Sequence, residues 1–321
     1  MKEMPPNIQI EITNFCNSKC TICPIKNMKR KRGVMEFVLF KKIIDECKEN
    51  NFSGIIAPFL EGEPFITPKI LTYLKYIRKQ IPKAKVGIFS NGSKLTDKLA
   101  SEIIKEELLD TLVISFDGGT KETYENIRVG LSFDETRNNV QNFLKLRKKF
   151  KKKKPFVEIS MVVTKENKKT MKLLEEEFKD ADKVSFHKFF NWAGQMKKSN
   201  KNYKNSKIRN FFVKRNVCNR LDSAITILFN GDVALCCWDY EGKVILGNIK
   251  NSTIKEIWNS EKLKNIRKAL KEREFEKLPL CYGCDFINQN PLYRQIIKTE
   301  AFLRKFPRLY KFMKNFYVTK V

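Results

Sequence analysis

Short apolar runs alternate with amphipathic stretches over the first 190 residues of this 321-residue chain. Six runs have the length and β-branched content of strands: Ile8–Ile12, Gly54–Leu60, Lys85–Phe89, Thr111–Ser115, Phe156–Val163 and Lys183–Lys188. Between them, apolar residues recur with a helical period over Glu36–Asn50, Pro68–Gln80, Thr96–Glu107, Phe133–Phe150 and Lys168–Phe178. This alternation predicts an α/β fold with a parallel sheet built from right-handed βαβ units.

The first strand runs directly into a group of cysteines. Cys16, Cys20 and Cys23 form a Cys-x3-Cys-x2-Cys motif within eight residues. Thiolate is the ligand of iron–sulfur clusters, and an ordinary 4Fe–4S cluster takes four of them. Three thiolates therefore leave one iron open, as catalytic metal sites do. Zinc is the alternative, but it needs a fourth ligand, and the only histidine, His187, is remote in sequence.

Candidate ligand-binding residues also lie at the ends of the next three strands. They are Gly62 and Glu63, Ser90 and Asn91, and Ser115 and Asp117, with Arg128 a little further on. The carboxyl ends of parallel strands share one edge of the sheet, where β/α folds carry their chemistry. Each pair alone also fits a plain turn or the cap of the next helix. Their order behind the cysteine motif favours one joint site.

The cysteine motif, with Glu11, Thr13 and Asn17 around it, and these strand-end residues resemble the radical S-adenosylmethionine (SAM) superfamily. Six β/α units are too few for the closed eight-stranded barrel, and the resemblance implies a partial (β/α)6 TIM-like barrel, open on one side. It also implies that SAM chelates the open iron. One-electron reduction then cleaves SAM to methionine and a 5′-deoxyadenosyl radical, which abstracts hydrogen from carbon.

The resemblance further implies which residues contact SAM. They are Gly62, Glu63, Ser90, Asn91, Ser115, Asp117 and Arg128. The glutamate region holds the SAM ammonium, the Ser-Asn-Gly loop lies near the ribose and methionine, and the arginine meets the SAM carboxylate. Glu61 departs from the family pattern, which commonly has glycine at that position.

A second set of cysteines lies in the last third of the chain, at Cys218, Cys236, Cys281 and Cys284. Two short runs, Thr226–Phe229 and Val233–Leu235, flank an Asn-Gly pair and predict a hairpin. A helical pattern over Ile254–Glu274 precedes the Cys-x2-Cys pair. Four cysteines fit a closed four-ligand site, for which zinc is one candidate metal. The spacing resembles the SPASM auxiliary-cluster domain, in the shortened form called Twitch because no cysteine follows Cys284, and implies one auxiliary 4Fe–4S cluster.

Two cysteines fall outside both sets. Cys47 shares a helical stripe with Phe40, Ile43 and Ile44, so we expect it in the core, where a free cysteine behaves as a small apolar residue. Cys237 directly follows Cys236, so its side chain should point elsewhere, and we interpret it as structural.

The pattern predicts four segments: a radical SAM partial barrel over 5–190, a linker over 191–213, a hairpin-plus-helix auxiliary cluster domain over 214–290 and a basic amphipathic helical tail over 291–321. The tail carries an apolar stripe of Leu309, Phe312, Met313 and Phe316. Such a stripe packs on the core or lies on a membrane surface.

The net charge of +28 comes from 64 Lys and Arg against 36 Asp and Glu. Basic clusters attract nucleic acid, anionic lipid or phosphorylated substrates. The alternative, which we favour, is that these lysines lie on solvated loops and helix faces. No apolar run is long enough to span a bilayer, and no secretory signal is visible. With nine cysteines, this predicts a cytoplasmic, reducing and oxygen-poor setting.

The sequence therefore predicts a radical SAM enzyme that oxidises a substrate carbon by dehydrogenation, with the auxiliary cluster as electron acceptor. Expected partners are an electron donor such as flavodoxin or ferredoxin and a small carbohydrate-like or peptide substrate. His187, at the end of the sixth strand, is the candidate catalytic residue because of its position and tunable pKa, although a lone histidine is more often a hydrogen-bonded structural residue. The alternatives are radical modification of a peptide (thioether formation or epimerisation) or of RNA, and a zinc-containing binding protein without enzymatic activity.

Overall fold

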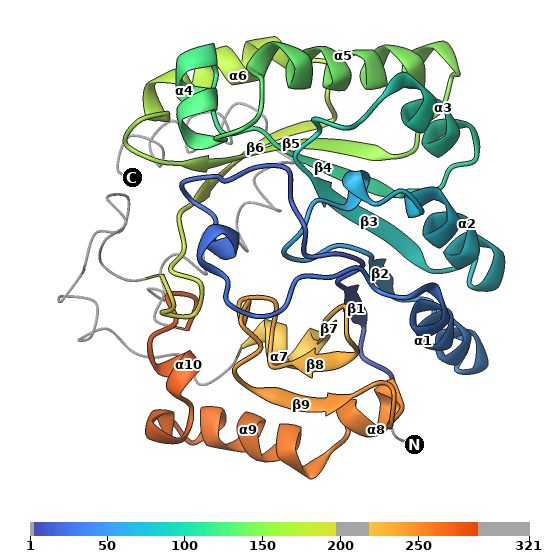
Figure 1. The fold of residues 1–321 in the computed structure, drawn as a ribbon, viewed down its shortest axis with the longest axis vertical. Helices are drawn as coiled ribbons and strands as arrows, with labels where there is room; N and C mark the ends of the chain where they lie inside the picture. The colour runs from blue at the N-terminus through green and yellow to red at the C-terminus, as the bar shows by residue number, and fades with distance from the viewer. Residues whose placement is uncertain (1–2, 197–217, 288–321) are drawn as a thin grey trace, which may run out of the picture. The chain divides into compact units, whose positions relative to one another are not determined.

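The strands expected from the apolar runs form one parallel sheet (Figure 1). The computed structural model describes residues 3–196 and 218–287. The strands are β1 (Asn7–Ile10), β2 (Ile55–Ala57), β3 (Lys85–Ser90), β4 (Thr111–Ser115), β5 (Phe156–Val163) and β6 (Lys183–Lys188). Strands that follow one another in the sequence lie side by side in the sheet, and each of these strand pairs is parallel. The predicted α/β partial (β/α)6 barrel is confirmed.

Helices cover the outer face of this sheet (Figure 1). They are α1 (Phe37–Glu49), α2 (Ile70–Gln80), α3 (Asp97–Lys105), α4 (Lys121–Ile127), α5 (Phe133–Lys149) and α6 (Met171–Glu177), which follows the 3-10 turn Lys168–Thr170. Cys47 lies on the buried side of α1 and is 0% exposed. Its prediction as a core residue is confirmed, and burial raises the pKa of its thiol.

The periodicity did not predict α4, a short helix that begins behind a capping box. The Thr120 hydroxyl accepts a hydrogen bond from the backbone N–H of Thr123, and the Thr123 side chain accepts one from the Thr120 N–H. Ser115 and Asp117 therefore do not cap this helix, which removes one alternative explanation of their presence after β4.

The predicted hairpin extends the barrel sheet. Its strands are β7 (Ala224–Ile227) and β8 (Asp232–Ala234), and β9 (Ile245–Asn248) pairs with β8. β7 pairs parallel with β1, so the sheet order is β6-β5-β4-β3-β2-β1-β7-β8-β9. Ile8 of β1 lies between Ile56 of β2 and Ile225 of β7. The strand that leads into the cysteine motif is thus held on both sides.

The described residues form two compact units. The larger holds residues 3–189 and 219–268, with all of the described strands and the helices α7 (Asn219–Ser223) and α8 (Ile254–Trp258). The smaller holds residues 190–196, 218 and 269–287, with α10 (Pro279–Tyr282) and the 3-10 turn Phe275–Lys277. The expected helix over Ile254–Glu274 is interrupted after Trp258, and its second part is α9 (Glu261–Lys271).

The predicted division into four segments remains a prediction. The tail 291–321 with its apolar stripe lies outside the described residues, and so does most of the linker 191–213. In the part of the chain that is described, no helix is both long and apolar enough to cross a membrane.

We expect replacement of Lys151–Lys154 by glutamine to leave substrate turnover unchanged. This run precedes β5, at the amino-terminal edge of the sheet, opposite the edge where the predicted site lies. Lys152 contacts Glu107 at 2.8 Å and Lys154 contacts Asp110 at 2.6 Å. Loss of such surface pairs costs at most about 1 kcal/mol each in the free energy of unfolding. A large loss of turnover at unchanged stability and iron content would show instead that this basic surface recruits a partner.

Candidate active site

The cysteine motif lies on the loop that leaves β1 and returns to α1. The Ser18 hydroxyl lies 3.2 Å from the Cys16 Sγ and 3.3 Å from the Cys20 Sγ, so one side chain contacts two of the three thiols. The Cys23 N–H donates to the Cys20 carbonyl at 3.2 Å, which turns the end of the motif back on itself. Cys20 and Cys23 also pack in an apolar cluster with Ile127. The three predicted ligands share one compact loop.

Glu63 joins this loop to the end of β3. Its backbone N–H donates to the Phe15 carbonyl at 2.9 Å. Its carboxylate accepts hydrogen bonds from the Ser90 hydroxyl at 2.8 Å and from the Asn91 N–H at 2.6 Å. Burial raises the pKa of the Glu63 carboxyl, against the lowering effect of these hydrogen bonds. Three residues that the sequence assigned to the SAM site therefore contact one another.

The Asn91 side chain makes a second link between the two loops. Its Nδ2 donates to the Asn17 Oδ1 at 2.9 Å, and the Asn17 Nδ2 donates to the Ser93 hydroxyl at 2.9 Å. Asn17 lies between Cys16 and Ser18, so the loop after β3 is fixed directly to the cysteine motif. Ser93 was not among the predicted site residues.

Asp117 and Arg128 form a buried ion pair beside the cysteine motif. Asp117 is 0% exposed and accepts hydrogen bonds from the Arg128 Nε at 2.6 Å and from the Val162 N–H at 2.6 Å. The Arg128 Nη1 lies 3.7 Å from the Cys20 Sγ. Burial alone would lower the pKa of Arg128, but Asp117 and the Cys20 sulfur raise it. A permanent positive charge therefore lies next to one predicted cluster ligand.

His187 lies on β6, with its side chain about half exposed and its Nε2 3.9 Å from the Glu158 Oε1 of β5. Lys183 Nζ lies 3.2 Å from both Glu158 oxygens. Burial alone would raise the pKa of Glu158, but His187, Ser185 and Lys183 lower it to about 2. Glu158 is therefore a carboxylate at any physiological pH, and it faces the one histidine of the chain.

Ser115 ends β4 opposite Ser160 of β5, in the register that also places Glu158 opposite Val113. Ser115 and Val113 alternate with Ile114, which is 0% exposed. Side chains alternate between the two faces of a strand, so Ser115 and Glu158 lie on the same face of the sheet. The predicted SAM contact and the predicted catalytic region therefore share that face.

The second cysteine set is distributed over both units. In the smaller unit Cys218, Cys281 and Cys284 are buried, and the Cys284 N–H donates to the Cys281 carbonyl at 3.2 Å. Asn191 Nδ2 donates to the Gly283 carbonyl at 2.7 Å, so the turn between these two cysteines is held by a residue that the sequence analysis did not select.

In the larger unit Cys236 and Cys237 follow β8. The Arg220 Nη1 lies 2.7 Å from the Cys237 Sγ, and the Arg220 guanidinium lies over the Trp238 ring at 4.2 Å. This local contact supports a structural role for Cys237 and leaves Cys236 as the predicted ligand.

The donor set of the first site, three thiols on one loop, fits an iron–sulfur cluster. Among residues 3–196 and 218–287, no three His, Cys, Asp or Glu side chains gather closely enough to hold one metal ion. The thiolates of a 4Fe–4S cluster bind different irons and need not converge on one point. Burial raises the pKa of the Cys16 and Cys23 thiols, and metal coordination is what deprotonates such thiols. These cysteines are suited to hold iron–sulfur.

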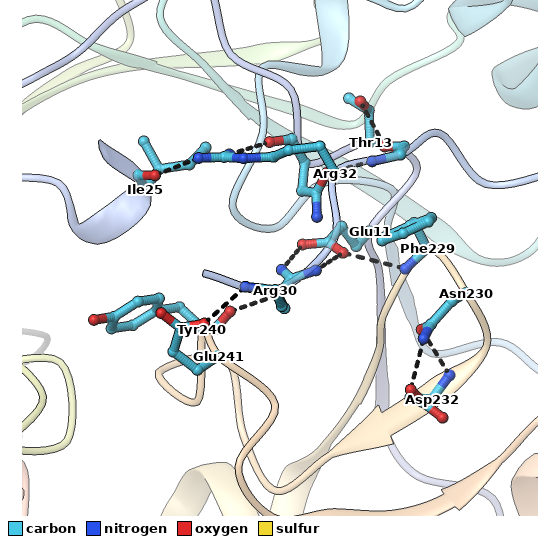
Figure 2. A network of polar contacts seen from close by, with 12 residues as sticks. Glu11, Thr13, Ile25, Arg30, Arg32, Phe229, Asn230, Asp232, Tyr240 and Glu241 are labelled. Carbon is cyan, nitrogen blue, oxygen red and sulfur yellow. Dashed lines mark hydrogen bonds and ion pairs between the residues drawn. The ribbon is translucent and has the colours of Figure 1, made fainter. Parts of the chain in front are cut away.

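Sequence analysis missed Arg30, whose side chain is only 12% exposed and forms an ion pair with the fully buried Glu11 (Figure 2). Arg30 belongs to the basic run Lys29–Arg32, in which nothing local distinguishes it from its neighbours. Glu61 is also buried nearby, and burial and Glu11 raise its pKa to about 8 against the effect of Arg30. The signal available in the sequence was Glu11, a carboxylate at the end of an apolar run and shortly before the cysteine motif, which needs a cation if it is buried.

Comparison with known families decides the assignment. The model of the radical SAM superfamily matches residues 10–177, and that of SPASM, an iron-sulfur cluster-binding domain, matches residues 218–285. The chain belongs to the radical SAM superfamily. Its cofactors are therefore SAM and two 4Fe–4S clusters, one in each matched region, and it is a radical SAM enzyme.

Relatives resemble this radical SAM enzyme over most of its length. The S-adenosyl-L-methionine-dependent 2-deoxy-scyllo-inosamine dehydrogenase of Niallia circulans is 24% identical over 282 residues, which are 88% of this chain and 93% of that protein. The crystal structure of BtrN in complex with AdoMet and 2-DOIA has a TM-score of 0.61 at 21% identity, covering 88% of this chain and 94% of that one. Native anSMEcpe with bound AdoMet has a TM-score of 0.68 at 20% identity, covering 96% and 99%. The structural likenesses show a shared fold.

We expect Gly62→Ala to prevent assembly of the SAM-binding site. A Cβ at this position would lie 2.3 Å from the Thr13 carbonyl oxygen and 2.7 Å from the Phe15 carbonyl oxygen, and neither backbone group can move without displacing the cysteine loop. Iron content after anaerobic reconstitution should fall by about half, because only the SAM-binding cluster is affected.

Gly87→Ala is the matched control for this substitution. Gly87 lies on β3, and the nearest atom to its added Cβ is 3.8 Å away, an ordinary contact. This variant should keep full iron content and SAM cleavage. Equal iron loss in both variants would show that the close approach at Gly62 is not what the site requires.

Proposed function

We propose that this radical SAM enzyme dehydrogenates a carbon that bears a hydroxyl or amino group in a small, carbohydrate-like molecule. The observation that carries the proposal is the likeness to the 2-deoxy-scyllo-inosamine dehydrogenase, which extends over 282 residues and therefore well beyond the barrel. In addition, Cys218, Cys236, Cys281 and Cys284 together supply the four thiolates that one auxiliary 4Fe–4S cluster takes. A single electron acceptor is sufficient for the oxidation of one carbon.

The balance of the reaction defines what the protein must supply. When bound, SAM and its cluster would supply the radical that removes a hydrogen atom from carbon, and the auxiliary cluster would supply the acceptor for one electron. The substrate hydroxyl must then lose a proton so that a carbonyl group forms. We propose that His187 accepts this proton, since imidazole is the side chain best suited to accept a proton near neutral pH. Glu158, 3.9 Å away and ionised, stabilises the imidazolium that results.

The residues around the cysteine motif are suited to hold SAM. In our proposal the Glu63 carboxylate, fixed by Ser90 and Asn91, binds the SAM ammonium. Arg128 and Asp117, with Ser115 and Gly62, complete the surroundings of SAM. We further propose that a flavodoxin or ferredoxin supplies the reducing electron in an oxygen-poor cytoplasm, because the open iron of such a cluster needs protection from oxygen.

The test is turnover by the anaerobically reconstituted enzyme with SAM and a chemical reductant. Aminocyclitols and amino sugars are offered as substrates, and 5′-deoxyadenosine and product are measured together. The expected result is 5′-deoxyadenosine formation stimulated by the substrate and a product that has lost two hydrogen atoms. His187→Gln should lower product formation more than SAM cleavage. Stimulation by no small polyol at all would contradict the proposed substrate class.

Peptide modification is the second candidate. The likeness to anSMEcpe extends over nearly the full length of both chains, and that protein has also been crystallised with AdoMet and Cp18Cys peptide. Peptides encoded beside the gene therefore belong in the same assay. A modified peptide in place of an oxidised polyol would favour this candidate.

A further inference from the structure

Arg30 connects segments that are far apart in sequence (Figure 2). Its guanidinium binds both oxygens of Glu11, and its Nε donates to the Tyr240 carbonyl at 2.5 Å. The backbone N–H groups of Lys29 and Arg30 donate to the Glu241 carboxylate at 3.0 Å and 3.1 Å. We refer to Glu11, Arg30, Phe229, Tyr240 and Glu241 as the Arg30 network.

The network joins two cysteine-bearing loops of the larger unit. Glu11 directly follows β1 and precedes the Cys16–Cys23 motif, while Arg30 lies on the return of the same loop. Tyr240 and Glu241 lie on the loop that carries Cys236. The Glu11 carboxylate also accepts a hydrogen bond from the backbone N–H of Phe229, in the turn between β7 and β8, at 3.2 Å. The Arg30 side chain therefore contacts both Glu11, before the Cys16–Cys23 motif, and Tyr240, on the loop that carries Cys236.

Burial separates this contact from an ordinary surface ion pair. The Arg30 side chain is 12% exposed and Glu11 is fully buried, whereas Lys29 and Lys31 on either side are exposed. A buried pair must overcome the loss of hydration of both charges, so it is weak evidence for stability, and its best-attested use is to fix one register of packing. The planar guanidinium fork can bind two carboxylate oxygens and a carbonyl together, which a lysine ammonium cannot do with the same geometry.

We propose that Arg30 is a positioning residue that holds the Cys16–Cys23 loop and the Cys236 loop in one register, so that SAM cleavage stays coupled to substrate oxidation. The coupling part rests on the proposed function, in which Cys236 serves the electron acceptor. The positioning part rests only on contacts within the larger unit. The two parts can therefore be tested separately.

The first test measures backbone hydrogen exchange in the holoenzyme for Arg30→Met and Arg30→Lys. The amides of Lys29, Arg30 and Phe229, which donate to network carboxylates, should exchange about tenfold faster in Arg30→Met. Arg30→Lys should restore part of the protection. Arg78→Met is the matched control, because Arg78 pairs with Asp110 at 2.7 Å with similar exposure but at the amino-terminal edge of the sheet. It should leave these amides protected.

The second test measures 5′-deoxyadenosine and product together in the same variants. Arg30→Met should form several-fold more 5′-deoxyadenosine per product than the wild type, with both clusters loaded, and Arg78→Met should not. If Arg30→Met fails to fold, Glu241→Ala removes the backbone anchors of the network without leaving a buried charge, and the same results are expected for it.

Two outcomes would overturn the inference. Unchanged exchange at these amides in Arg30→Met would show that the network does not position the loops. Faster exchange with a wild-type ratio of 5′-deoxyadenosine to product would show that the register does not affect coupling. Failure of the proposed function is recognised separately, because the wild-type enzyme would then oxidise no small polyol while the exchange result still stands.

Discussion

Replacing Cys16, Cys20 and Cys23 together by alanine is expected to abolish SAM cleavage and to leave about four of about eight irons per chain. The three thiols lie on one loop, and the Ser18 hydroxyl contacts two of them. Without them no iron remains to which SAM can bind, whereas the auxiliary cysteines are untouched. Iron analysis and a 5′-deoxyadenosine assay after anaerobic reconstitution measure both effects.

Cys47→Ala is the control for this experiment. Cys47 is a free cysteine like the three cysteines of the motif, but it lies on α1, is 0% exposed and packs in the core. Its loss should reduce thermal stability slightly through the small cavity it leaves and keep all of the iron. SAM cleavage that persists in the triple variant would contradict the assignment of the cluster ligands and of the reaction.

The second large effect is expected from Cys281→Ala or Cys284→Ala, which should spare reductive SAM cleavage and abolish turnover of the true substrate. These cysteines belong to the smaller unit and to the region matched by the SPASM model. In this assignment they are not ligands of the cluster whose open iron SAM chelates, so SAM cleavage should continue. Without the auxiliary cluster the oxidation lacks its acceptor for the second electron.

Cys237→Ala separates this effect from general damage to the region. Cys237 neighbours the predicted ligand Cys236 but contacts Arg220 through its sulfur at 2.7 Å. This variant should retain about eight irons and substantial turnover. Stoichiometric zinc in the second site of the wild type, or turnover retained in Cys284→Ala, would refute the electron-acceptor role.

Much of the barrel was predictable because its signals are local. The predicted bounds of β4, β5 and β6 agree with the structure, since each strand is a short apolar run bounded by polar or turn residues. α4 was missed because it has only seven residues, and its capping box of two threonines lacks the usual glutamate. The helix expected over Ile254–Glu274 breaks after Trp258, and the Ser260 hydroxyl accepts a hydrogen bond from the Leu263 N–H at the start of α9.

The sequence by itself determined the cysteine motif, the strand-end residues and the parallel α/β fold, since ligand spacing and apolar periodicity are properties of short segments. Only the tertiary structure decided that β7 pairs with β1 and that Glu63 reaches Ser90 and Asn91. It also decided that Arg30, one cation in a basic run, is buried against Glu11. Such contacts depend on which segments the folded chain brings together, and a buried charge finds its partner there by proximity in space and not along the sequence.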